Sequence, residues 1–95
     1  MKKSLIEKIK KYLKEKPVLR AYIFGSVSRN ESEKDSDIDI LVELDYSQSI
    51  GLEFIEMQLD LEEILHLKVD LLSSNAISKY IKPFIDKDKI LIYEK

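Results

Sequence analysis

The spacing of apolar positions changes several times along the chain, and each spacing predicts a different element. In residues 4–16 apolar side chains recur every three to four positions until Pro17, which predicts an amphipathic helix. Residues 18–24 are rich in β-forming side chains and stop at a glycine, so they predict a strand. Residues 38–44 alternate and predict a second strand. Its two faces carry Ile38, Ile40 and Val42 on one side, and Asp37, Asp39, Leu41 and Glu43 on the other.

The longest helix is predicted over residues 52–65, and it carries two apolar stripes. A helix with two such stripes is either buried on two sides or contacts a partner, so this helix is also a candidate oligomer interface. The first stripe contains Phe54, Met57, Leu61, Ile64 and Leu65. The second contains Leu52, Ile55 and Leu59.

The last third of the chain predicts a strand, a helix and a final edge strand. The strand covers residues 68–72, and Ser74 or Asn75 caps the helix that follows. Pro83 lies inside this helical pattern, where it should kink or split the helix. Residues 90–93 predict the edge strand. The apolar face of the helix is Ile77, Tyr80, Ile81, Phe84 and Ile85.

These elements predict an α+β fold with an α/β-like order, in which helices flank one mixed sheet of three to four strands. With 95 residues, we expect a single domain over residues 1–95. The chain has no cysteine, which excludes disulfides and thiolate metal sites. Neither a membrane-spanning apolar run nor a signal-peptide pattern occurs, so we expect no membrane association and a cytoplasmic location.

The net charge of −2 conceals two segments of opposite sign. Residues 1–20 carry eight Lys or Arg and two Glu, whereas residues 31–70 carry thirteen Asp or Glu and two Lys. An acidic middle disfavours direct binding of nucleic acid. It suits carboxylates that hold divalent cations, although solvated helix faces account for most of these residues.

A Gly-Ser pair and three aspartates are the candidate chemical groups. Gly25 and Ser26 follow a strand, where exposed N–H groups and a small hydroxyl can bind phosphate. Asp37 and Asp39 lie two positions apart in a strand and share a face, so a divalent cation would relieve their repulsion. Asp70 lies among apolar residues of another predicted strand, which is unusual unless it has a partner.

Together these groups favour two-metal nucleotidyl transfer. All-oxygen ligands suit Mg²⁺ or Mn²⁺, so the predicted metal ligands and catalytic residues are Asp37, Asp39 and Asp70. Asp70 is the candidate to orient or deprotonate the acceptor hydroxyl. The alternative readings are a capped turn at Gly25 and Ser26, a solvent-facing strand edge for Asp37 and Asp39, and a capped or salt-bridged strand end for Asp70.

Gly25-Ser26, ten residues and Asp37-x-Asp39 resemble the signature of the polymerase-β-type nucleotidyltransferase superfamily. The match is most similar to the minimal nucleotidyltransferase (MNT) family and spans nearly the whole chain, including Lys68-Val69-Asp70-Leu71. This resemblance implies the polymerase-β-type fold, ATP as substrate, Mg²⁺, and a HEPN-domain toxin as partner, since MNT proteins transfer AMP to a tyrosine of such toxins.

The chain departs from the family pattern at three positions. Val27 and Asn30 replace an Arg and a Gly that are common in the family, which puts the strength of nucleotide binding in doubt. Arg29 remains, either as a nucleotide-binding residue that contacts phosphate or as a surface ion pair. His66 stands where a Gly is common after the long helix, and it tolerates left-handed backbone better than most residues.

The leading hypothesis is an Mg²⁺-dependent nucleotidyltransferase that transfers AMP from ATP to a tyrosine of a partner HEPN toxin and acts as its antitoxin. One alternative is an antitoxin that neutralises its partner by binding alone. Another is a template-free nucleotide transferase acting on RNA, which the acidic middle disfavours.

Overall fold

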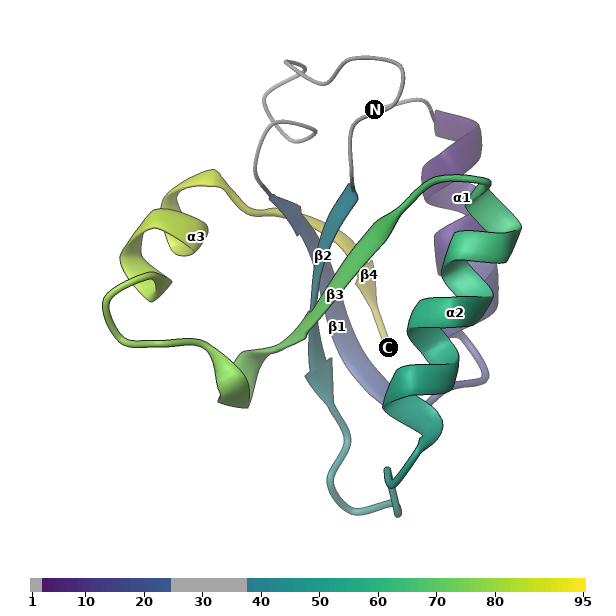
Figure 1. Cartoon of the computed structure of the whole chain (residues 1–95), viewed down its shortest axis with the longest axis horizontal. Coiled ribbons are helices and arrows are strands. Elements are labelled where there is room, and N and C mark those ends of the chain that lie inside the picture. Colours follow the sequence, from purple (N-terminus) through teal and green to yellow (C-terminus); the bar gives the residue numbers. More distant parts are fainter. Residues whose placement is uncertain (1–2, 25–37) are drawn as a thin grey trace.

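Four strands form one mixed sheet, in the order β3-β2-β1-β4 (Figure 1). The computed structural model describes residues 3–24 and 38–95, and within these β1 is antiparallel to both β2 and β4. β2 is parallel to β3, and a parallel pair requires a crossover, which α2 provides. The predicted mixed sheet, with its last strand at an edge, is confirmed. The strands are β1 (Val18–Phe24), β2 (Ile38–Leu44), β3 (Val69–Ser73) and β4 (Ile90–Glu94).

Two helices, α1 (Lys3–Leu13) and α2 (Glu53–Leu65), lie side by side on one face of the sheet (Figure 1). The alternation of β2 explains why they do, because every second side chain of that strand is apolar and points towards them. The core between the sheet and these helices includes Ile9, Leu13, Ile38, Ile40, Val42, Met57, Leu61 and Leu65.

α1 is shorter than the predicted helix over 4–16. It begins at Lys3, so Ser4 lies inside it rather than capping it, and it ends at Leu13. The residue before a proline is disfavoured in helical backbone, so the chain turns before Pro17. The Lys16 N–H donates to the Leu13 carbonyl in this turn (3.0 Å).

α2 buries one of its two predicted stripes. Met57, Leu61 and Leu65 are buried, and Phe54 and Ile64 are partly buried against the core. The second stripe is exposed to solvent, so the expectation of burial on two sides is wrong for this chain alone. Its exposed fractions are 74% for Leu52, 58% for Ile55 and 58% for Leu59. Contact of this stripe with a partner stays a prediction.

His66 ends α2 in a left-handed conformation, with φ 54° and ψ 36°. Left-handed residues commonly terminate helices because they redirect the chain while satisfying the last carbonyls. Glycine is the usual residue in such a turn, and here His66 adopts the same conformation.

The predicted helix beginning at Ser74 or Asn75 is wrong. Residues Ser74–Ala76 form a short 3₁₀ helix, η1, and Ile77 is extended (φ −80°, ψ 131°). α3 covers Lys82–Asp88, so Pro83 lies in its first turn. Proline fits there, because N–H groups of the first turn have no partner within the helix and the missing N–H costs nothing. Of the predicted apolar face only Ile85 is buried.

α3 lies on the face of the sheet opposite α1 and α2 (Figure 1). Leu41 of β2 points to this face and is 3% exposed, and Ile85 is the buried residue of α3. No helix within residues 3–24 and 38–95 is long and apolar enough to cross a membrane.

Candidate active site

Asp39 and Asp70 lie next to each other on neighbouring strands. Each is the second residue of its strand, and the parallel register pairs them directly. Their strand neighbours, including Ile38 and Val69, are buried against α1 and α2, so both carboxylates point to the opposite face. Paired residues of adjacent strands are about 5 Å apart, so one ligand can contact both carboxylates.

The register at this end of the sheet is held by the backbone. The Ile38 N–H donates to the Lys68 carbonyl (2.9 Å), and the strand pairing continues from Ile38–Val69 to Val42–Ser73. Phe24, the last residue of β1, pairs with Asp39 on the other side. The ends of three strands therefore meet around Asp39.

The remaining predicted site residues lie outside the described residues. These are Gly25, Ser26, Arg29 and Asp37, together with the short helix considered possible after Ser26. Their roles, and the catalytic and metal-binding roles of Asp39 and Asp70, stay predictions. The last described residue before this segment is Phe24 and the first one after it is Ile38. Both lie beside Asp39.

The donor atoms at Asp39 and Asp70 fit Mg²⁺ or Mn²⁺. Both side chains offer hard carboxylate oxygens, and Asp70 is exposed, so a cation that keeps several waters can be accommodated. In residues 3–24 and 38–95 no group of three His, Cys, Asp or Glu side chains could hold a metal ion. Because the third predicted ligand is Asp37, the described residues supply two of the three.

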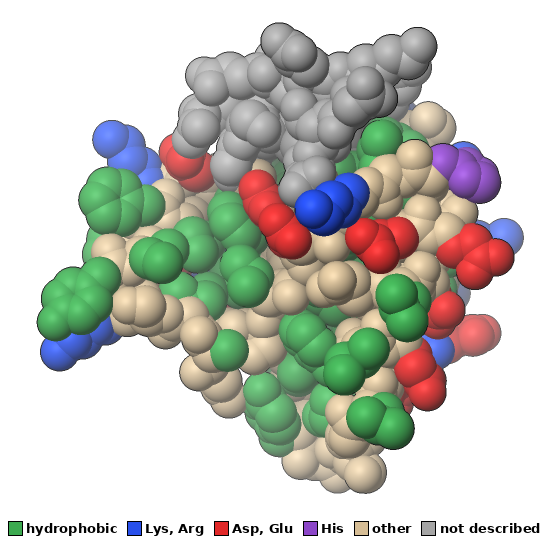
Figure 2. Space-filling model, in the orientation of Figure 1, with side chains coloured by type: hydrophobic (Ala, Val, Ile, Leu, Met, Phe, Trp, Pro, Cys, Tyr) green, Lys and Arg blue, Asp and Glu red, His purple; other side chains and the backbone are tan. Residues whose placement is uncertain are grey.

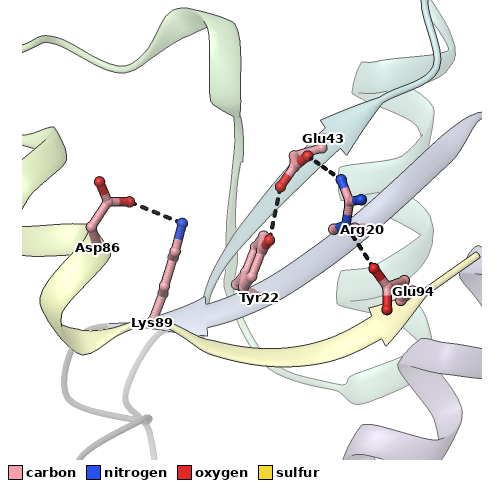
Figure 3. A network of polar contacts seen from close by, with 6 residues as sticks. All are labelled: Arg20, Tyr22, Glu43, Asp86, Lys89 and Glu94. Carbon is pink, nitrogen blue, oxygen red and sulfur yellow. Dashed lines mark hydrogen bonds and ion pairs between the residues drawn. The ribbon is translucent and has the colours of Figure 1, made fainter.

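A polar network that the sequence did not single out covers the same face of the sheet (Figure 3). Arg20 of β1 bridges two strands, donating from Nη1 to Glu43 of β2 (2.9 Å) and from Nε to Glu94 of β4 (2.8 Å). The Tyr22 hydroxyl donates to the other oxygen of Glu43 (2.8 Å). Lys89 Nζ lies 4.5 Å from the centre of the Tyr22 ring. The network ties three strands together on the face of the sheet that carries Asp39.

The network shifts the titration of its members. The hydrogen bond from Tyr22, followed by the contacts with Arg20, lowers the pKa of Glu43. Burial and the same hydrogen bond raise the pKa of Tyr22. The sequence held a signal for this arrangement, since Arg20 and Tyr22 lie two positions apart in a strand, but their partners depend on strand pairing.

Comparison with known proteins identifies the class of protein that this fold and site define. Residues 7–95 match the family described as polymerase beta, nucleotidyltransferase. The match covers nearly the whole chain, so the chain belongs to this nucleotidyltransferase family, as its Gly-Ser and Asp-x-Asp pattern predicted. The predicted enzyme class is confirmed.

Two relatives carry more particular names. A protein of Methanocaldococcus jannaschii, provisionally named a protein adenylyltransferase, is 44% identical over 95% of this chain and 93% of its own length. Protein adenylyltransferase MntA of Thermococcus cleftensis is 34% identical over 94% of this chain and 90% of its own length.

Solved structures confirm the predicted fold. A chain of a toxin–antitoxin crystallised with AMP-PNP superposes with a TM-score of 0.81, at 24% identity over 95% of this chain and 73% of that chain. A complex of tri-AMPylated Shewanella oneidensis HEPN toxin with MNT antitoxin superposes with a TM-score of 0.76, at 23% identity over 100% of this chain and 74% of that chain.

Proposed function

We propose that this chain is a protein adenylyltransferase that transfers AMP from ATP to a tyrosine hydroxyl of a HEPN-domain toxin and thereby acts as its antitoxin. The single observation that carries the proposal is the direct pairing of Asp39 with Asp70 on one face of the sheet. The names of the M. jannaschii and T. cleftensis relatives support protein as the acceptor, and the S. oneidensis complex supports a HEPN toxin.

The residues of the site divide the work of the reaction. In this proposal Asp39 and Asp37 would hold Mg²⁺, and Gly25 and Ser26, with Arg29, would bind the phosphates of ATP. A divalent cation held there would supply positive charge to the triphosphate and to the leaving pyrophosphate. Asp70, exposed beside Asp39, orients the acceptor hydroxyl and accepts its proton.

The atoms and charges of the transfer balance with ATP, the acceptor hydroxyl and the Asp70 carboxylate. The acceptor O–H bond breaks and its proton passes to the Asp70 carboxylate. A bond then forms from the acceptor oxygen to the α-phosphorus of ATP while the bond to the β-phosphate oxygen breaks. The products are AMP-tyrosine and pyrophosphate, so no further reactant is required.

A labelling assay tests the proposal. The chain is incubated with ATP labelled at the α-phosphate, Mg²⁺ and a HEPN-domain toxin from the same genome. The wild type should label that protein, and Asp39→Asn should reduce the rate by about 100-fold or more, as removal of a group acting in the transition state does. Mass spectrometry should place the AMP on tyrosine.

Glu63→Gln is the matched control, because Glu63 is an exposed carboxylate on α2, on the opposite face. It should label at the wild-type rate. Equal labelling by Asp39→Asn contradicts the proposal. If Asp39→Asn fails to label yet neutralises the toxin fully, the chain is an antitoxin that acts by binding. Extension of RNA without labelling of protein would instead identify a template-free nucleotide transferase.

A further inference from the structure

Residues 78–88, which comprise α3 and the turn before it, project from the sheet on the face that carries Asp39 and Asp70 (Figure 1). They carry three large apolar side chains that the core does not use. The exposed fractions are 75% for Tyr80, 54% for Ile81 and 72% for Phe84. Figure 2 shows hydrophobic side chains gathered on this projecting part of the surface.

These three residues form one continuous surface, which we call the α3 patch. The Ile81 N–H donates to the Ser78 carbonyl (3.1 Å) and the Phe84 N–H to the Ile81 carbonyl (3.0 Å), so Tyr80 and Ile81 lie in a hydrogen-bonded turn that leads directly into α3. Side chains three and four positions apart on a helix are neighbours. Large exposed apolar patches on soluble proteins mark interaction sites.

The segment that carries the α3 patch is anchored through Ile85 and Lys89. Ile85 is buried beneath it, and Asp86 bridges Lys82 (2.7 Å) and Lys89 (2.9 Å). Lys89 in turn lies over the ring of Tyr22 in β1. An apolar surface on the same face of the sheet as Asp39 and Asp70 can position a partner as well as bind it.

The charges around the α3 patch define its partner. Residues 77–89 carry four lysines and two aspartates, and the Lys79 ammonium lies 5.4 Å from the Tyr80 ring. Lys82 and Lys89 share Asp86, so the surroundings of this apolar patch keep a net positive charge that comes mainly from Lys79 and Lys87. The patch complements a protein surface that is apolar and flanked by carboxylates.

We propose that the α3 patch is the docking surface for the protein that carries the acceptor hydroxyl, and that docking there delivers the hydroxyl to Asp39 and Asp70. The docked surface is apolar and flanked by carboxylates. This inference rests on the proposed function, since it supplies the contact that brings a protein acceptor to that site.

Two other occupants fit less well. A second copy bound patch to patch would bring two surroundings of the same positive charge together, because a two-fold contact pairs the same surface with itself. RNA binding depends on several cations that contact successive phosphates, whereas two of the four lysines here, Lys82 and Lys89, already pair with Asp86.

Binding measurements with the HEPN-domain protein as probe test the inference. Phe84→Asp should weaken binding by about thirty-fold, the usual effect of removing an aromatic anchor from an interface. Because Phe84 is 72% exposed, the variant should fold normally. Ile55→Asp is the matched control, since Ile55 is a similarly exposed apolar residue on α2, at the opposite face of the sheet.

Kinetics separate docking from chemistry. Phe84→Asp should raise KM for the HEPN protein, leave kcat at saturation near that of the wild type, and leave binding of a fluorescent ATP analogue unchanged. Asp39→Asn should do the reverse, lowering kcat. If Phe84→Asp loses binding but even the wild type transfers no AMP, docking at α3 stands and the proposed function fails.

The remaining outcomes overturn the inference. They are wild-type affinity in Phe84→Asp, loss of binding in Ile55→Asp instead, and no binding by the wild type. It is also overturned if Phe84→Asp disrupts a dimer in sedimentation without affecting the HEPN protein, or abolishes binding of a labelled single-stranded RNA while leaving HEPN binding intact.

Discussion

At the scale of single residues, the face that carries the site is governed by charge. Glu43 accepts hydrogen bonds from both Tyr22 and Arg20, and these favour its ionised form. Its folded pKa is therefore lowered. A carboxylate with a lowered pKa stabilises the fold above its unfolded pKa, near 4.5 here, and this contribution is lost as the pH falls through the folded pKa.

The variant Glu43→Gln should reduce the unfolding free energy at pH 7 by about 1 kcal/mol, a value reduced for the partial exposure of this group. It should also flatten the fall in melting temperature below about pH 4.5, where the wild type loses this contribution. Thermal unfolding followed by circular dichroism between pH 3 and pH 7 measures both effects.

Part of the acid sensitivity should remain in this variant, because hydrogen bonds from Ser47 to Asp45 and from Lys82 to Asp86 also lower the pKa of those carboxyls. Glu63→Gln, on the exposed side of α2, should follow the wild-type profile. Identical profiles for Glu43→Gln and the wild type would show that the network contributes no stability.

At the scale of elements, boundaries follow local backbone chemistry. Pro83 was expected to interrupt a helix, and in the structure it lies in the first turn of a later one. His66 ends α2 with a positive φ, a conformation that costs most side chains about 1 kcal/mol because Cβ approaches the carbonyl oxygen. Helix ends are therefore places where a single substitution changes the fold's stability without touching the core.

The variant His66→Gly should raise the unfolding free energy by about 0.5–1 kcal/mol, because glycine adopts a left-handed backbone without this cost. His66→Val should lower it, since a β-branched side chain is least tolerant of positive φ. Urea unfolding at pH 7 measures the two changes. Destabilisation by glycine would contradict the assignment of strain to this position.

At the scale of the whole molecule, the sheet separates a core from a site. α1 and α2 pack on one face and form the core with it, and Leu61 of α2 is 0% exposed there. The other face carries the polar network, Asp39 and Asp70. The buried core and the candidate site thus lie on opposite faces of the same four strands. Substitutions on one side should leave the other largely unaffected.

The variant Leu61→Ala should lower the unfolding free energy by about 2–5 kcal/mol, since it leaves a cavity in the core. Leu59→Ala, on the same helix but 58% exposed, should change it by no more than about 0.5 kcal/mol. Denaturant titration measures the pair. Equal effects would mean that the second stripe of α2 is buried in solution, as an oligomer through this helix requires.

Much of the local structure followed from the sequence. The bounds of β1 and β2 are those that the apolar patterns predicted, because alternation and β-propensity act over a few residues. The helix expected from residue 74 was wrong, because local spacing alone does not maintain a helix whose apolar face is not buried. Its apolar residues have helical spacing, but only Ile85 is buried, so packing did not extend the helix to its expected start.

The sequence alone determined the family, the alternating strands and the residues expected to carry the chemistry, since each depends on spacing along the chain. Only the tertiary structure decided which groups meet. The pairing of Asp39 with Asp70, the bridges from Arg20 to β2 and β4, and the exposed patch on α3 all depend on strand order and helix placement. Those are set by the burial of apolar surface between distant segments, which no local pattern encodes.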